Sequence, residues 1–295
     1  MNELLSECPI CLNKTFDPFL KCKDFTVSGE SFDIVSCNQC GFKFTNPRPD
    51  TSSIGKYYES EDYVSHSNST TGLINKLYHY IKSIAIRNKI DLIRNLKPNN
   101  KKILDIGCGT GSFLGAIKEK GWEVKGIEPN SKARGVAIND FNISVDAELS
   151  LQKLKIAGYS VITMWHVLEH VHLLKEKVRE IHSLLENDGY AVIAVPNNTS
   201  WDAKHYQSFW AAYDVPRHLS HFTPITIKKL FLEDGFLHFK SFPMKFDSFY
   251  VSMLSEKYKK STLGIVKAFI NGMMSNLKAD NAEKYSSVIY VFKKQ

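Results

Sequence analysis

The sequence has no apolar run that approaches the roughly 18 residues needed to cross a bilayer. Its N-terminus lacks the basic start and apolar stretch of a secretory signal peptide. Long blocks of like charge are also missing, although the net charge is +7. These absences argue against a spanning or secreted protein and against a basic arm for nucleic acid, so we expect a cytoplasmic protein.

Two common nucleotide motifs are missing as well. There is no phosphate loop of the form G-x-x-x-x-G-K-[ST], and the dinucleotide fingerprint G-x-G-x-x-G fails because Ser112 replaces its third glycine. The chain is nevertheless long enough for a full α/β domain and an accessory piece, with 295 residues and a hydrophobic content of 43%. A different cofactor motif is therefore expected.

That motif is present between Lys102 and Leu114. A short apolar run ends in Asp105, three glycines follow at alternate positions, and a second apolar stretch begins. This pattern predicts a buried parallel strand, a tight turn and a helix. Glu128 ends the next apolar strand, where an acid is placed to accept hydrogen bonds from a ribose diol. Both acids and the turn should line one crevice for a small cofactor.

Four runs of the sequence, LDIGCGTGSFL, GIEPN, VITMWHVLEHV and GYAVIAVPN, resemble a class I S-adenosylmethionine-dependent methyltransferase over roughly residues 85 to 295. The resemblance implies an α/β fold, with a Rossmann-like seven-stranded methyltransferase sheet whose last hairpin is antiparallel. It also implies S-adenosylmethionine as cofactor and S-adenosylhomocysteine as product. Ser160 departs from the family, which commonly has Asp there, and the [DNS]-P-P-[YF] signature of amino-group methylation is missing.

The resemblance assigns cofactor contacts to particular positions. Asp105 and the glycine turn would face the methionine end and the ribose, Glu128 the ribose hydroxyls, and Asp146 and Ala147 the adenine. The predicted cofactor-binding set is Asp105, Gly107, Gly109, Gly111, Glu128, Pro129, Asp146, Ala147, Trp165 and His166.

The cysteines point to a metal. Cys8, Cys11, Cys37 and Cys40 form two C-x-x-C pairs, and four thiolates match the tetrahedral preference of structural Zn²⁺. The segment between the pairs is too small for a core of its own, so metal binding would supply stability. A redox pair or two incidental pairs are the alternatives.

We divide the chain into a zinc-ribbon-like knuckle module at 1–46, an aromatic lid or linker at 47–72, and a methyltransferase domain at 73–295. The middle segment contains Tyr57, Tyr58, Tyr63, Ser65 and His66, and a polar joint at 67–71. It resembles a substrate lid in zinc-bearing members of the group, but a plain linker explains it equally well. A helical insertion at about 247–280 could cover the site or form the face of a homodimer.

Methyl transfer to a hydroxyl needs an aligned acceptor and a group that takes its proton. Histidine suits that task near neutral pH, and the predicted catalytic residues are His170, His218 and His221. Arg217 could bind an anionic group of the substrate or form a salt bridge with Asp214. His166, Glu169 and His170 with a loop histidine also resemble the metal-assisted site of small-RNA 2′-O-methyltransferases, although that family has Glu at the position of His166.

The sequence thus predicts a methyltransferase that modifies a hydroxyl, or less readily a carbon, of a small or sugar-type acceptor such as a glycan-linked metabolite. An RNA methyltransferase that grips its target with the zinc module is one alternative, since the chain is basic. A non-catalytic cofactor-binding or zinc-scaffold protein is another alternative, but the intact acids and glycines of the cofactor motif argue against it.

Overall fold

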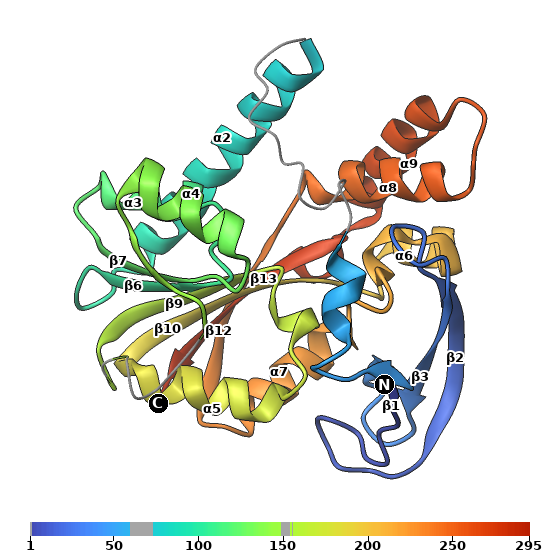
Figure 1. Cartoon of the computed structure of the whole chain (residues 1–295), viewed down its shortest axis with the longest axis horizontal. Coiled ribbons are helices and arrows are strands. Elements are labelled where there is room, and N and C mark those ends of the chain that lie inside the picture. The colour runs from blue at the N-terminus through green and yellow to red at the C-terminus, as the bar shows by residue number, and fades with distance from the viewer. Residues whose placement is uncertain (1, 60–72, 149–153, 155) are drawn as a thin grey trace.

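The structure is a computed structural model that describes residues 2–59, 73–148, 154 and 156–295 (Figure 1). Part of the predicted aromatic lid or linker lies outside the described residues, namely Tyr63, Ser65, His66 and the predicted joint at 67–71.

A seven-stranded sheet forms the centre of the molecule, with the order β12-β13-β10-β9-β6-β7-β8. The five strands from β10 to β8 are parallel, and β13 runs antiparallel to both of its neighbours. The strands are β6 (Lys102–Ile106), β7 (Glu123–Ile127), β8 (Ser144–Asp146), β9 (Tyr159–Trp165), β10 (Leu185–Pro196), β12 (Phe236–Pro243) and β13 (Ser287–Lys294). The predicted seven-stranded methyltransferase sheet with an antiparallel last hairpin is confirmed.

Helices cover both faces of this sheet, which explains why its central strands β6 and β9 are buried over most of their length. One face packs against α2 (Leu73–Asn95), α3 (Ser112–Lys118) and α4 (Ser131–Phe141), and the other against α5 (Leu174–Leu184) and α7 (Pro224–Leu232). The parallel strands all end at one edge. The predicted cofactor turn lies there, between β6 and α3.

The N-terminal segment forms a second sheet of four strands, in the order β11-β4-β3-β2. Its own strands are β2 (Phe16–Lys23), β3 (Ser31–Cys37) and β4 (Lys43–Thr45), while β1 (Asn2–Glu3) pairs with β5 (Arg48–Pro49). The fourth strand, β11 (Ser220–His221), comes from the loop that contains the predicted catalytic histidines. This sheet therefore contains strands from both the predicted N-terminal module and the predicted methyltransferase domain.

The cores of the two parts are continuous. Cys8, Ile10, Phe42 and Phe44 belong to the same buried cluster as the residues between the central sheet and α5. The ring centroids of Phe42 and Phe222 are 5.6 Å apart. The N-terminal module thus completes its core with the large domain, which the sequence did not predict.

A helical hairpin of α8 (Asp247–Tyr258) and α9 (Gly264–Lys278) projects from the body beyond α6 (Trp201–Tyr206) (Figure 1). Short 3-10 helices complete the fold: η1 (Ile54–Tyr58), η2 (Leu168–His170), η3 (Gln207–Phe209), η4 (Ala211–Tyr213) and η5 (Ala282–Lys284). Within the described part of the chain, none of the helices is both long enough and apolar enough to cross a membrane.

Candidate active site

Asp105 is the buried acid at the end of β6, with 2% of its surface exposed. Its Oδ1 accepts a hydrogen bond of 2.5 Å from the hydroxyl of Thr163 on the neighbouring strand. Burial raises the pKa of Asp105 to about 7, although Thr163 and Lys89 act in the opposite direction. A buried carboxylate of this kind gains most when a cationic ligand group comes beside it.

The glycine turn shows why three glycines are needed. All three have positive φ, and a Cβ on Gly107 would lie 2.4 Å from Val167 Cγ2, while one on Gly111 would lie 2.7 Å from Ala137 Cβ. A Cβ on Gly109 would meet nothing within 4 Å. Packing therefore requires the outer two glycines, and the middle one presents open backbone to a ligand.

Glu128 closes this turn from the side of β7. Its Oε2 accepts a hydrogen bond of 2.8 Å from the Gly109 N–H, and its Oε1 accepts one of 2.8 Å from Asn130 N–H. The next residue, Pro129, begins the turn into α4, and its carbonyl accepts a hydrogen bond from Arg134. The predicted ribose-binding acid is thus in direct contact with the middle glycine of the turn.

The predicted adenine-side residues lie one strand further out. Asp146 ends β8 and forms an ion pair of 2.9 Å with Lys125, and Ala147 follows it on the surface. The backbone carbonyl of Asp146 accepts a hydrogen bond from Glu128 N–H. Both residues therefore border the same strand edge as Glu128.

Trp165 and Lys89 face each other above the end of β9. The indole Nε1 is buried and, among the described residues, has no hydrogen-bond partner, while Lys89 Nζ lies 4.2 Å from the ring centroid. Burial lowers the pKa of Lys89, and the nearby Asp105 and Asp247 counteract it. Lys89 was not predicted from the sequence as a residue of the cofactor site. The pattern that could have identified it is a lysine at a position that falls within the apolar stripe of α2.

His166 adopts a left-handed backbone conformation, with φ of +57°, and lies between two carboxylates. Its Nδ1 is 3.3 Å from Glu169 Oε1, and its Nε2 is 3.0 Å from Asp247 Oδ2 at the start of α8. Burial lowers the pKa of His166, but the two carboxylates outweigh it and raise it to about 10. His166 is therefore a cation at neutral pH and not a proton acceptor.

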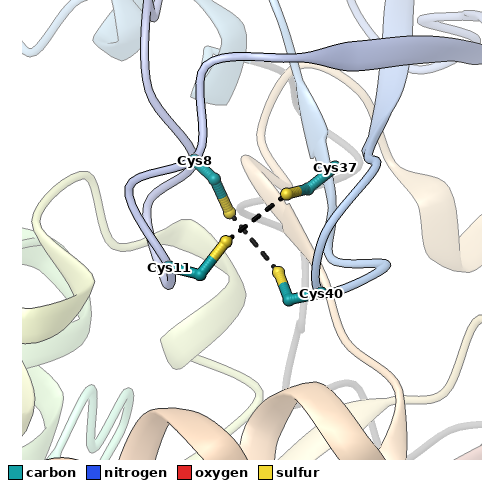
Figure 2. A group of neighbouring side chains, drawn as sticks. All are labelled: Cys8, Cys11, Cys37 and Cys40. Atoms are coloured by element: carbon teal, nitrogen blue, oxygen red, sulfur yellow. Dashed lines mark hydrogen bonds between the residues drawn. The ribbon is translucent and has the colours of Figure 1, made fainter.

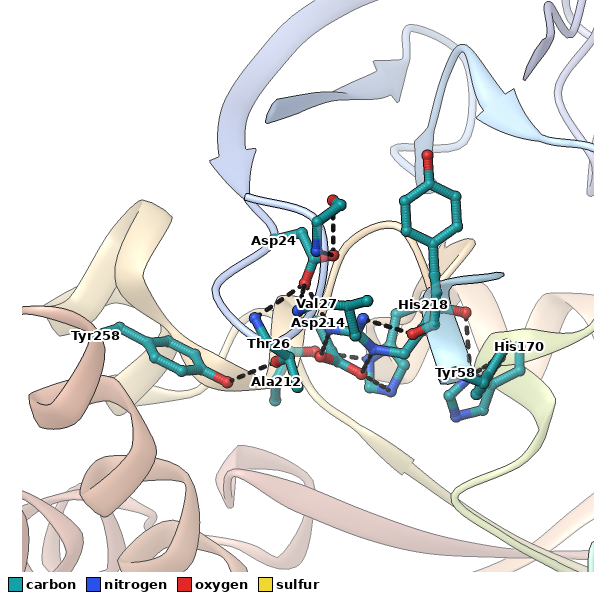
Figure 3. A network of polar contacts seen from close by, with 12 residues as sticks. Asp24, Thr26, Val27, Tyr58, His170, Ala212, Asp214, His218 and Tyr258 are labelled. Carbon is teal, nitrogen blue, oxygen red and sulfur yellow. Dashed lines mark hydrogen bonds and ion pairs between the residues drawn. The ribbon is translucent and has the colours of Figure 1, made fainter. Parts of the chain in front are cut away.

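His170 and His218 lie together, with ring centroids 4.6 Å apart (Figure 3). His170 Nδ1 is 3.0 Å from the carbonyl of Arg217 and 2.9 Å from the Tyr58 hydroxyl, and His218 Nδ1 is 2.8 Å from the Ala212 carbonyl. Because a carbonyl only accepts, Nδ1 must carry the proton in both rings. When uncharged, each ring therefore has its lone pair on Nε2.

Glu169 is fully buried between these histidines. Neither carboxylate oxygen receives a hydrogen bond of good geometry from the described residues, although His166 is in ion-pair range. One ligand atom each from Glu169, His170 and His218 lie within 4.8 Å of one another. This group could hold a divalent cation or stabilise a protonated histidine. Of the residues in the metal-assisted resemblance, the group contains Glu169, His170 and, as the loop histidine, His218, but not His166.

His221 has a different surrounding. Thr45 Oγ1 donates its proton to the His218 carbonyl at 2.9 Å, so His221 Nε2, at 3.1 Å, must donate to the Thr45 oxygen. Burial, with nearby His218 and Lys43, lowers the pKa of His221 well below its usual value. His221 therefore links β11 to β4 as a neutral ring.

Arg217 is 1% exposed and is saturated by protein acceptors. It donates to both carboxylate oxygens of Asp214, at 2.9 and 2.6 Å, to Asp24 at 3.0 Å and to the Tyr57 carbonyl at 2.9 Å. Of the two roles considered for Arg217, the salt bridge with Asp214 is the one found. The arginine joins the N-terminal segment, through Asp24 and the Tyr57 carbonyl, to the histidine loop.

The four cysteines of the two C-x-x-C pairs converge on one point (Figure 2). Sulfur–sulfur distances are 3.6 Å for Cys8 and Cys40 and 3.4 Å for Cys11 and Cys37, and no disulfide links them. A tetrahedral Zn²⁺ with bonds of about 2.3 Å would separate its sulfurs by about 3.8 Å. The four thiols therefore fit a closed zinc shell, remote in sequence from the cofactor turn.

Comparison with known proteins identifies a family and a fold. A profile of the family described as "Methyltransferase domain" matches residues 78–237. The chain is 28% identical to a ubiquinone biosynthesis O-methyltransferase of Cupriavidus pinatubonensis over 165 residues, 52% of this chain and 62% of the relative. It is 36% identical to the enzyme of the same name from an Azoarcus species over 78 residues, 24% of this chain and 34% of the relative.

The chain thus matches between about a third and three fifths of the length of these curated relatives. In fold it is similar to a crystal structure described as a sarcosine dimethylglycine methyltransferase from Galdieria sulphuraria. The TM-score is 0.53 at 13% identity, over 73% of this chain and 86% of the other.

Proposed function

Since the chain belongs to the methyltransferase domain family, we propose that it transfers a methyl group from S-adenosylmethionine to a hydroxyl oxygen of a small or glycan-linked metabolite. The cofactor part of this proposal rests on one observation. The backbone of Gly109 is accessible to a ligand, and it lies between the buried Asp105 at the end of β6 and Glu128 at the end of β7. Open backbone between two strand-end acids is what a nucleoside with a cationic amino acid arm requires.

The cofactor's methionine arm carries an ammonium and a carboxylate, and the site offers an opposite charge for each. Asp105 would bind the ammonium, and the amino group of Lys89 would bind the carboxylate. Glu128 would exchange its hydrogen bond with Gly109 for bonds from the ribose hydroxyls. Asp146 and Ala147 would border the adenine, and the unpartnered Trp165 Nε1 would donate to the bound ligand.

The acceptor side is proposed to lie at the His170–His218 pair. The acceptor proton would move to His218 Nε2, whose Nδ1–H is fixed by the Ala212 carbonyl, while the freed oxygen attacks the methyl carbon. The electrons of the broken C–S bond return to sulfur, which leaves S-adenosylhomocysteine. Glu169 would stabilise the imidazolium. His170, whose pKa burial and the nearby His218 lower to about 4, would accept a hydrogen bond without taking the proton.

An oxygen acceptor is favoured over carbon by two facts. The curated relatives with the matched segments are named O-methyltransferases, and the site contains a fixed histidine lone pair suited to a hydroxyl proton. His221 would position β11 and not act as the base, because its Nε2 is a donor to Thr45.

Zinc is proposed for the four cysteines as a structural ion. A closed shell of four sulfurs leaves no ligand position for a substrate, so the ion would fix the two loops that begin β2 and end β3. Metal analysis of the purified protein should give one zinc per chain, and a Cys8→Ser/Cys37→Ser variant should give none.

The experiment for the proposed function has two parts. Calorimetry should detect binding of S-adenosylmethionine and S-adenosylhomocysteine, and labelled methyl should appear on a phenolic or sugar hydroxyl from a panel of small acceptors. No cofactor binding would refute the proposal and favour a non-catalytic zinc scaffold. Cofactor binding with tight, strongly salt-dependent RNA association and methylation of RNA alone would refute the acceptor class.

A further inference from the structure

The hairpin of α8 and α9 has an inverted distribution of polarity. On α9, the residues that face the body are small or polar, namely Ala268, Asn271, Gly272 and Ser275. The outward face contains large apolar side chains at helical spacing: Ile265, Val266, Phe269, Ile270, Met273 and Leu277, which are 42–82% exposed. A water-facing helix normally shows the reverse arrangement.

The inward face of the hairpin is bound to the body by hydrogen bonds and close packing. The exposure of the outward apolar side chains therefore does not result from a loosely packed hairpin. Ser275 Oγ donates to Asp202 on α6 at 2.7 Å, and Tyr206 OH donates to Glu256 on α8 at 3.0 Å. A Cβ on Gly272 would lie 2.7 Å from the Phe249 ring, so α8 and α9 are in close contact. The apolar stripe is therefore held rigidly in its outward position.

The exposed charges of the hairpin all have one sign. Between residues 245 and 278 every exposed charged side chain is a lysine: Lys245, Lys257, Lys259, Lys260, Lys267 and Lys278. The two acids in this range are turned inward, Asp247 to His166 and Glu256 to Tyr206. At the tip, Leu263 is 75% exposed and adjoins Lys259 and Lys260 in the connecting turn.

We propose that this hairpin is a docking surface for an anionic lipid bilayer. Outward apolar side chains beside a cluster of lysines are the combination that binds the headgroup region of such a membrane, without any helix crossing it. A second copy of the chain fits less well. A two-fold contact through the same face would set the lysines of one copy against those of the other.

The surface is connected to the active site. Asp247, the first residue of α8, forms the ion pair with His166 at the end of β9, and the tip of the hairpin lies at the other end of α8. Twelve helical residues span about 18 Å. Docking through the hairpin would therefore set the candidate site close to the membrane surface, where an acceptor attached to a lipid could reach it.

The test is co-sedimentation of the full chain with vesicles and needs no methyl transfer. Wild-type protein should bind vesicles of phosphatidylcholine mixed with phosphatidylglycerol, bind pure phosphatidylcholine weakly, and be released by salt. Ile265→Asp/Leu277→Asp and Lys259→Glu/Lys260→Glu should each reduce binding at least about tenfold. Ile225→Asp, which charges an equally exposed side chain on α7, is the matched control and should bind like the wild type.

Both changed pairs are strongly exposed, so unchanged thermal unfolding and cofactor affinity would show that the variants fold. Absence of wild-type binding to the anionic vesicles would overturn the proposal, as would full binding by Ile265→Asp/Leu277→Asp. A dimer in sedimentation velocity that this variant disperses, with no vesicle binding, would assign the face to a second copy instead.

Discussion

The cofactor side and the acceptor side of the candidate site are built in different ways. Asp105, Gly109 and Glu128 come from one stretch of chain, and Glu128 contacts Gly109 across 19 positions. The acceptor side joins Tyr58 to His170 across 112 positions and Asp24 to Arg217 across 193. The first is a local supersecondary unit, whereas the second exists only once the N-terminal sheet has packed against the large domain. Damage to that sheet should reach the acceptor and spare the cofactor.

Removal of the proposed zinc is the strongest test of this difference. Chelation, or Cys37→Ser, should abolish methyl transfer and lower the thermal unfolding temperature markedly, because the metal fixes the ends of the N-terminal strands. Cofactor affinity measured by calorimetry should stay within about twofold, as expected for separate sites. Cys22→Ala changes a buried cysteine outside the cluster and should keep its metal. Equal loss of both functions would show that the two sides are one unit.

His218→Gln should separate the two sides without unfolding either. Loss of the proposed proton acceptor should lower kcat by about 10²–10⁴-fold, while the dissociation constant of S-adenosylmethionine stays unchanged. Steady-state kinetics and calorimetry measure the two quantities. His205→Gln, an exposed histidine stacked on Trp201, is the control. A variant with full kcat would remove His218 from the chemistry.

Asp105→Asn should have the converse effect. The variant loses the carboxylate proposed to bind the cofactor's ammonium, so affinity should fall about 100-fold, while the acceptor side keeps its fold. Since burial raises the pKa of Asp105 to about 7, wild-type affinity should also increase as pH rises through 7. Titrations at several pH values test both statements, with the exposed Asp140→Asn as control. Affinity that is flat with pH in the wild type would contradict the assignment.

The difference between a cofactor side built from local contacts and an acceptor side built from distant segments also decides what could be predicted from the sequence. The glycine turn and Glu128 follow from periodicity and spacing within one βαβ unit, and the sheet order follows from the family pattern. The pairing of β11 with β4 has no local signal, because both strands are very short and lie in distant segments. The protonation of His166 depends on Asp247, which a sequence pattern does not place beside it. Long-range contacts of this kind are set by tertiary packing.

Arg217→Lys tests the joint between the N-terminal sheet and the histidine loop. Lysine keeps the charge but cannot make the paired bonds to Asp214 together with those to Asp24 and Tyr57. We expect a loss in the free energy of unfolding of up to about 3–5 kcal/mol, the cost of a disrupted buried ion pair. Arg179→Lys, whose exposed guanidinium pairs with Asp234, should change the free energy of unfolding much less, because water screens that pair. Urea denaturation measures both, and equal losses would show that the buried joint adds nothing.

The last comparison concerns His166 and His170, four residues apart, whose pKa values shift in opposite directions. The pKa of His166 is raised to about 10, so its contribution to stability is complete below 6.5 and disappears as pH rises from there toward 10. The pKa of His170 is lowered to about 4, so the folded protein loses stability as pH falls from 6.5 toward 4. The difference in unfolding free energy between wild type and His166→Gln should therefore shrink on the alkaline side, and that for His170→Gln on the acid side. Urea denaturation across pH measures each difference. If both differences changed on the same side of neutrality, the two histidines would share one electrostatic environment. His166 and His170 would then belong to the same side of the candidate site.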